Sequence, residues 1–413
     1  MKKVICLGFC TMVLLLSAVN PAAAKFDATA SLALKEMYTD NVFLTRTNRD
    51  HDFITIISPS VGLKYIHRYM DLSLDYGVDF KYYSRHSNLN ESSLSEIQNI
   101  KLQNQFRPFN RVFIDVSDTY KRVPIDNRKK VAFDNLFVDM TDSNVFYISP
   151  RVEYPLSPTL LTNFGYRFTN VWYKADEGND SDSHSAFFSI KKIFSPSLTT
   201  ALKYDFLAQK PKKTEDYDRH QGSVAVTYLI GPQFVINGEI GEAFFDYKVR
   251  DDEKLTFWNL STDYKLRITE GTTMGASYSS SFSDSITQGV YKSRKLDLRF
   301  QTGTSLKLTI NPYYTVDKYL ETGRKDKVTA VALDVSKALS GKIDSSIRVL
   351  YERQKFQPNN EKIIKLSIGS NLDYKLNRYL TASVGYTHNN NNSDNNANDF
   401  HNNVVWLKSK FTF

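Results

Sequence analysis

Apolar and polar side chains alternate along most of this chain, and the segment from Met70 to Tyr83 shows the alternation most clearly. One set of alternate positions is apolar and holds Leu72, Leu74, Tyr76, Val78, Phe80 and Tyr82. The positions between them hold Asp71, Ser73, Asp75, Gly77, Asp79 and Lys81. A period of two residues places the two sets on opposite faces of a β-strand, whereas a helix would mix them. The segment therefore predicts a strand with one apolar face and one polar face.

Such segments recur along the chain, and the polar breaks between them alternate in length. Short breaks, such as His67 to Tyr69 and Ser195 to Ser197, alternate along the chain with longer ones, such as Arg122 to Asp142. Barrels of the bacterial outer membrane have short periplasmic turns and longer outer loops. We therefore predict an all-β fold, a transmembrane antiparallel up-and-down β-barrel. The asparagine-rich run from Asn389 to Asn398 is expected to be a solvated outer loop.

The segments add up to about 20 strands, an even number, as a single-chain barrel of the bacterial outer membrane requires. The first strand, about Phe26 to Tyr38, has the weakest pattern, and a barrel of 18 strands would result if it lay outside the wall. Residues 25–413 are expected to form one barrel domain.

The N-terminus has the features of a secretory signal peptide. Lys2 and Lys3 precede an apolar stretch too short to span a bilayer, and Ala22 to Ala24 provide an A-x-A site. We expect residues 1–24 to be cleaved and the remainder to reach the outer membrane of a Gram-negative cell. Both cysteines, Cys6 and Cys10, fall in this segment, so the mature chain is expected to contain no disulfide.

The C-terminal residues alternate up to the last position. Val405, Leu407, Phe411 and Phe413 share one face, and Ser409 departs from the apolar pattern. This ending resembles the signal that the barrel-assembly machinery reads in outer-membrane proteins, with Phe411 and Phe413 as its aromatic residues. The assembly machinery is therefore an expected partner, together with outer-membrane lipid and lipopolysaccharide.

The polar face of the predicted strands carries charges of both signs, which need water or one another. A barrel of 18 to 20 strands is too wide to be filled by side chains, so we expect a wide, hydrated lumen of mixed charge. The residues predicted to line it are Asp71, Asp75, Asp79, Lys81, Asp115, Lys203, Asp205, Lys295, Asp297, Arg299, Lys365, Asp373 and Lys375.

The longest break, Arg122 to Asp142, is the candidate to fold inward and constrict the pore. Basic residues lie near its start and acidic residues near its end: Arg122, Arg128, Lys129 and Lys130, then Asp134, Asp139 and Asp142. Opposed clusters of this kind across a constriction would orient a polar solute. A loop that stands outside in water is an equally good interpretation of the same residues.

Composition narrows the remaining possibilities. Aromatic residues make up 13% of the chain, which suits the girdles of a membrane barrel. The net charge of +8, of which Lys2 and Lys3 supply two, is spread along the chain, so no nucleic-acid partner is expected. The seven histidines show no zinc spacing and no catalytic motif. We therefore expect no enzymatic activity, no metal and no cofactor.

One stretch near the N-terminus resembles a known family. The residues are Glu36 to Leu44 (EMYTDNVFL), Asp52 to Thr55 (DFIT), Ser58-Pro59 and Gly62-Leu63. They resemble the opening of the beta-barrel porin 2 family, including its branch associated with the PEP-CTERM/exosortase system. The resemblance implies an outer-membrane barrel and a link to exopolysaccharide production.

Two functions remain open at this point. The first is a channel for exopolysaccharide export or for the passive passage of polar solutes, with polysaccharide or an export complex as partner. The second is a structural sleeve of an outer-membrane complex, such as the barrel of a porin-cytochrome electron conduit.

Overall fold

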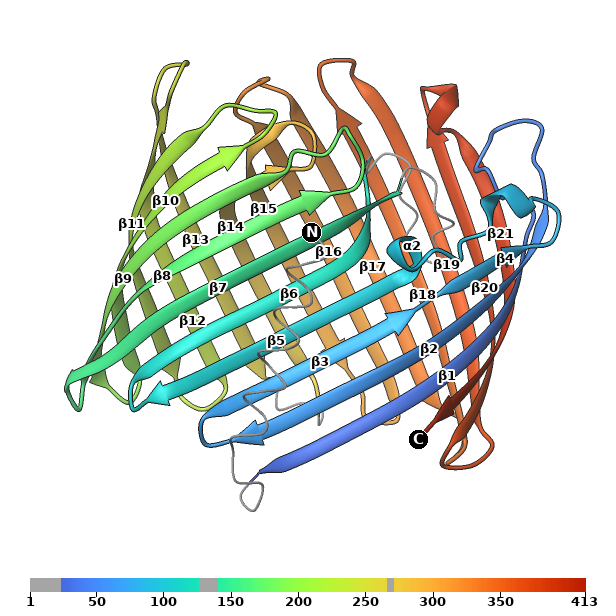
Figure 1. Cartoon of the computed structure of the whole chain (residues 1–413), viewed down its shortest axis with the longest axis horizontal. Helices are drawn as coiled ribbons and strands as arrows, with labels where there is room; N and C mark the ends of the chain where they lie inside the picture. Colours follow the sequence, from blue (N-terminus) through green and yellow to red (C-terminus); the bar gives the residue numbers. More distant parts are fainter. Residues whose placement is uncertain (1–23, 126–139, 266–270) are drawn as a thin grey trace.

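A computed structural model describes residues 24–125, 140–265 and 271–413. These residues form one antiparallel sheet that closes on itself, because β1 (Lys25–Thr39) pairs with β2 (Asp52–His67) on one side and with β21 (Phe400–Thr412) on the other. The strands run obliquely around the barrel (Figure 1).

The remaining strands follow in chain order, each paired with its neighbours. They are β3 (Met70–Val78), β4 (Phe80–Tyr83), β5 (Gln98–Phe109), β6 (Val112–Pro124), β7 (Met140–Ser157), β8 (Leu160–Tyr173), β9 (Ser181–Ser195), β10 (Leu198–Pro211), β11 (Tyr217–Ile230), β12 (Phe234–Tyr247), β13 (Glu253–Lys265), β14 (Thr273–Ser285), β15 (Gly289–Thr302), β16 (Leu306–Tyr319), β17 (Lys325–Ala338), β18 (Ile343–Phe356), β19 (Glu361–Lys375) and β20 (Leu380–Ser393).

The barrel wall has 20 strands, because β3 and β4 are two parts of one. Both pair with β2 in the same register, and they are separated at Asp79. The first strand is part of the wall and closes the barrel, so the prediction of 20 strands is confirmed and the alternative of 18 is wrong.

Closure satisfies the backbone hydrogen bonds, which have no partner in lipid. One face of the wall carries large apolar side chains that the protein leaves uncovered, for example Leu202, Ile240 and Ile347. Because this is the outer face of a closed barrel, lipid rather than protein covers it. The alternation in the sequence therefore reports the two sides of the wall.

The two ends of the barrel differ. At the barrel end where β1 begins and β21 ends, the turns are short, such as residues 68–69 and 110–111. The long connections lie at the opposite end of the barrel (Figure 1). We call the end with short turns the periplasmic end and the opposite end the outer end.

The asparagine-rich run is only partly a loop, which corrects the prediction. Asn389 and Asn391 belong to β20, are 2% exposed and face inward, where Asn389 accepts a 2.7 Å hydrogen bond from Ser367. Asn398 is also buried and donates a 2.7 Å hydrogen bond to Glu361. Composition alone did not reveal these contacts because their partners come from neighbouring strands.

Helices are limited to single turns in the described residues: η2 (Ser87–Leu89), α2 (Leu94–Ile97) and η3 (Asn396–Asn398). In the same ranges, none has the length and apolar character that a membrane-crossing helix needs.

Candidate functional site

The inner face of the wall is the candidate site, and the strand register defines which residues belong to it. Directly paired residues of neighbouring strands point to the same side. Following the pairs from β2 round to β21 places all the predicted lumen residues on the face opposite the lipid-facing apolar side chains. These are Asp71, Asp75, Asp79, Lys81, Asp115, Lys203, Asp205, Lys295, Asp297, Arg299, Lys365, Asp373 and Lys375.

The inner charges compensate one another in pairs spread around the wall rather than meeting at one centre. The closest contacts of five such pairs are Lys203–Glu239 at 3.1 Å, Asp205–Arg219 at 3.0 Å, Lys295–Asp297 at 2.7 Å, Arg299–Asp263 at 3.0 Å and Lys375–Asp344 at 2.7 Å. Solvated pairs of this kind contribute at most about 1 kcal/mol each. They therefore suit a wall that faces water.

Two of the predicted lumen residues, Lys81 and Lys365, are buried rather than exposed to the lumen. Lys81 is 4% exposed, and its Nζ lies 2.7 Å from Glu91, in the segment that connects β4 to α2. Lys365 is 6% exposed. Both lie towards the outer end, where chain segments pack against the inner face.

The predicted constriction loop is shorter than the sequence indicated. Arg122 and Asp142 are strand residues of β6 and β7 that pair directly with each other. Arg122 also donates a hydrogen bond to Glu91, and its Nε lies 3.6 Å from Asp142. The other predicted constriction residues lie outside the described residues: Arg128, Lys129, Lys130, Asp134 and Asp139.

A different hairpin, formed by β14 and β15, folds inward at the outer end. The ladder between β13 and β14 ends at Leu260–Tyr278, although β14 continues to Ser285. Beyond that point, Lys292 donates a hydrogen bond to the backbone oxygen of Thr256 in β13. The upper part of β14 has therefore left its place beside β13 and lies against the inner surface of that strand.

Aromatic packing holds this hairpin in place. Phe282 of β14 lies 5.0 Å from Phe245 of β12, measured between ring centroids, and 6.3 Å from Phe257 of β13. Phe245 is 1% exposed and belongs to a buried cluster with Tyr217 and Val290. The side of the hairpin that would otherwise meet lipid is thus covered by the inner surface of β12 and β13.

Polar contacts extend the hairpin's reach. Tyr217 Oη donates a 3.1 Å hydrogen bond to Asp284, and the backbone nitrogen of Asn179 donates a 2.7 Å hydrogen bond to the oxygen of Ile286. The hairpin tip therefore reaches the connection between β8 and β9.

A second apolar cluster covers the inner face across the barrel. Met37, Ile54, Tyr83 and Val404 come from β1, β2, β4 and β21, and Val42 comes from the loop after β1. Strands β1 and β12, which contribute to the two clusters, are ten wall strands apart in a 20-strand barrel, so the clusters face each other. The outer end is therefore narrowed from two opposite sides.

A buried carboxylate anchors the loop beside this cluster. Asp52 is fully buried and accepts hydrogen bonds from Ser84 Oγ at 2.9 Å and from the backbone nitrogens of Arg85 and His86 at 3.0 and 3.1 Å. His86 Nδ1 lies 2.8 Å from the same carboxylate. This hydrogen bond with Asp52, together with Asp50, raises the pKa of His86 above its ordinary value.

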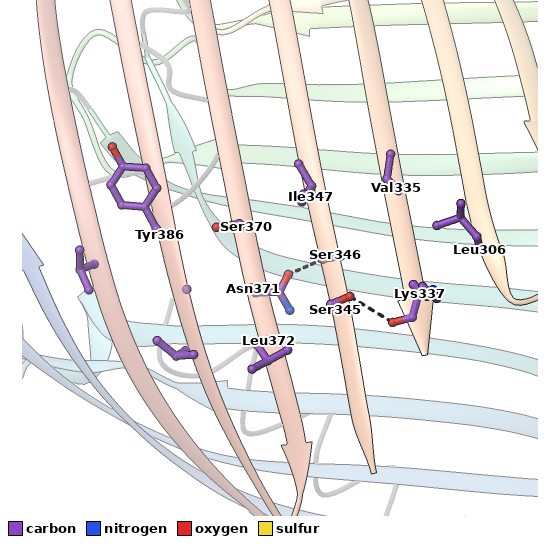
Figure 2. A pocket seen from close by; sticks show the side chains of 13 residues that line it. Leu306, Val335, Lys337, Ser345, Ser346, Ile347, Ser370, Asn371, Leu372 and Tyr386 are labelled. Atoms are coloured by element: carbon purple, nitrogen blue, oxygen red, sulfur yellow. Dashed lines mark hydrogen bonds between the residues drawn. The ribbon is translucent and has the colours of Figure 1, made fainter. Parts of the chain in front are cut away.

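Two hollows lie on the wall. One of about 460 Å³ is lined mainly by inner-face residues, among them Lys64, Asp71 and Gln103. The other, of about 510 Å³, is lined mostly by lipid-facing side chains such as Leu306 and Ile347, and its Ser345 Oγ donates a hydrogen bond to the oxygen of Lys337 (Figure 2). Only the first belongs to the lumen.

The described residues contain no group of three His, Cys, Asp or Glu side chains placed to hold a metal ion. The aromatic residues of the predicted assembly signal are at the seam. Phe411 pairs with Leu32 of β1 and with Leu380 of β20, and Phe411 and Phe413 are both exposed on the lipid side.

The closed sheet, its lipid-facing apolar surface and its charged inner face define an outer-membrane β-barrel of the porin type. Residues 328–413 match the family model described as "Putative beta-barrel porin 2". The resemblance to this family predicted from the N-terminal motif is thus found again in the C-terminal strands, whereas the motif itself lies in β1, β2 and the loop between them.

Solved structures share the fold at low sequence identity. The siderophore receptor PirA from Pseudomonas aeruginosa is 8% identical, with a TM-score of 0.53 over 96% of this chain and 81% of the other. The copper transporter OprC is 10% identical, with a TM-score of 0.51 over 96% and 82%. A mutant of the ferric enterobactin receptor PfeA from Pseudomonas aeruginosa is 8% identical, with a TM-score of 0.51 over 95% and 82%. Comparison with curated protein sequences finds no match.

Proposed function

We propose that the barrel is a water-filled channel for polar solutes across the bacterial outer membrane. The observation that carries the proposal is the inner face itself, which presents paired charges of both signs on strands as far apart as β3, β10, β15 and β19. Charged side chains on so many strands need water beside them. Their pairing favours polar solutes without selecting strongly for one sign of charge.

The proposed physiological solute is an exopolysaccharide on its way out of the cell. The family resemblance supports this class, since the branch it points to accompanies exopolysaccharide production. The proposal brings with it a periplasmic export complex as a partner, besides the assembly machinery and the lipid and lipopolysaccharide around the barrel. The channel needs no enzymatic activity of its own.

Conductance of the purified barrel in planar bilayers tests the channel. We expect discrete open-channel steps that grow with salt concentration and show weak selectivity between anions and cations. A correctly folded barrel without open-channel current would contradict the channel and would favour a structural sleeve that a partner fills.

A further inference from the structure

A row of uncharged polar side chains crosses the inner face, and its lower half lies on β3 to β7. Ser73 is directly paired with Gln103, Gln103 with Ser117, and Ser117 with Tyr147. Paired residues lie on the same face, about 4.8 Å apart at each strand step. The four side chains therefore form a continuous line.

The line continues on the next strands without a charged residue. Tyr147 pairs with Thr169, Thr169 with Ser183, Ser183 with Gln209 and Gln209 with Tyr217. We call the eight residues from Ser73 to Tyr217 the hydroxyl–amide row.

The row climbs from one end of the barrel to the other. Ser73 is three residues from the start of β3 at its periplasmic end, whereas Gln209 is two residues from the outer end of β10 and Tyr217 begins β11. Tilted strands produce such a climb, because a line of direct partners runs across the strands and not around the rim. The row is therefore a spiral track along the lumen wall.

Half of the row is open to the lumen: Ser73, Gln103, Tyr147 and Thr169 are partly or fully exposed, whereas the other four residues are buried. In the described residues, Ser73, Gln103, Thr169 and Gln209 form no side-chain hydrogen bond with another residue, and none has a polar atom that is both buried and unpartnered. Several inner-face residues one step towards the periplasm are already engaged.

Those neighbours bond to one another. Arg107 donates to Asp71 and to Gln105 at 2.8 Å, and Gln105 donates to Asp115 at 2.9 Å. Arg151 then donates to Asp115 at 2.8 Å. Charges on the periplasmic side of the row therefore hold each other in place, while Ser73, Gln103 and Thr169 keep their donors and acceptors free for a ligand.

The row begins in a hollow of the inner face and ends beneath the inward hairpin. The 460 Å³ hollow on the inner face includes Ser73, Gln103 and Tyr147 in its lining. At the outer end, Tyr217 donates to Asp284 of the inward hairpin, so the hairpin covers the top of the row. A ligand on the row would pass beneath the hairpin.

We propose that the hydroxyl–amide row is a binding track for an extended, uncharged glycan chain. Hydroxyl and amide groups both donate and accept hydrogen bonds, as do the hydroxyls of a sugar. A regular series of such groups matches a repeating polymer, and the absence of charge in the row favours neutral sugar units. The inference rests on the proposed channel function and names its substrate class.

Calorimetric titration of the detergent-solubilised full-length barrel with maltohexaose tests the track. We expect saturable binding that glucose does not reproduce, and weaker binding of a hexamer of galacturonate. The triple variant Ser73→Ala, Gln103→Ala, Thr169→Ala should raise the dissociation constant for maltohexaose at least tenfold. A heat-modifiable band on a gel shows that the variant has folded.

The matched control is Ser277→Ala, Gln301→Ala, Thr309→Ala, which removes the same three residue types from the inner face of β14 to β16, away from the row. Unchanged binding in the control and weakened binding in the row variant support the track. Absence of saturable maltohexaose binding, or equal losses in both variants, overturns it. Calorimetry measures binding independently of ion current. A barrel that binds maltohexaose but carries no open-channel current would refute only the channel, and a barrel that carries current but does not bind maltohexaose would refute only the track.

Discussion

Three inner-face glycines lie directly opposite aromatic rings on the neighbouring strand. Gly165 is paired with Phe187, Gly241 with Phe257 and Gly385 with Trp406. In each case an added Cβ would meet the ring of the partner. Each ring occupies the space that a Cβ would need, so these glycines are required for close approach and not for a turn.

Gly385→Ala is expected to displace Trp406 and to lower the free energy of unfolding by about 1–3 kcal/mol, the usual cost of overpacking. Urea unfolding followed by tryptophan fluorescence measures the loss. Gly238→Ala is the control, because an added Cβ there meets nothing within 4 Å. Equal stability of the two variants would show that the ring does not depend on the glycine.

His86 gives the loop after β4 a pH dependence. Its pKa is raised in the folded protein, so the stabilisation by Asp52 and Asp50 is complete below the ordinary histidine pKa of about 6.5 and disappears as the pH rises through the higher folded value. Protease cleavage within residues 84–91 should accelerate above that range. In His86→Gln the cleavage rate should no longer depend on pH. If the variant keeps the pH dependence of the unmodified protein, another group is responsible for it.

At the scale of elements, the inward hairpin is the feature that the sequence did not predict. Its upper half contains Ser279, Ser280, Ser281 and Ser283, so both faces of β14 are small and polar apart from Phe282, where a lipid-facing strand would carry several apolar residues. That loss of alternation was the available signal. The strand it packs against could not be inferred, because Phe245 and Phe282 are far apart in sequence and meet only through the closed sheet.

Phe245→Ala should release the hairpin. Removing a fully buried phenylalanine costs about 3–5 kcal/mol, and here the loss falls on the contact with Phe282. We expect faster amide exchange in residues 280–294 and larger single-channel conductance.

Phe244→Ala is the matched control, since Phe244 is the next residue and is 47% exposed on the lipid side. It should leave exchange in residues 280–294 unchanged. Similar exchange rates in the two variants would contradict the docking of the hairpin against β12.

At the scale of the whole molecule, the sequence was sufficient for the fold because one physical rule repeats in every strand. Period-two alternation predicts the two faces, and the parity of loop lengths predicts the two ends. Residues such as Asp71, Asp205 and Asp373 lie on the inner face as this alternation requires. The rule says nothing about which inner residues lie side by side. That depends on register, which is why the hydroxyl–amide row emerged only from the structure.

The central claim is that the wall has lipid on one side and water on the other, and single-cysteine scanning of β18 tests it most directly. Both native cysteines lie within residues 1–24, so each introduced thiol is unique in the rest of the chain. With the barrel in liposomes, cysteines at Ile347, Val349 and Tyr351 should carry labels quenched by lipid-soluble agents, and those at Ser346, Arg348 and Leu350 should react with water-soluble reagents. Equal accessibility to water-soluble reagents at all six positions would contradict the account.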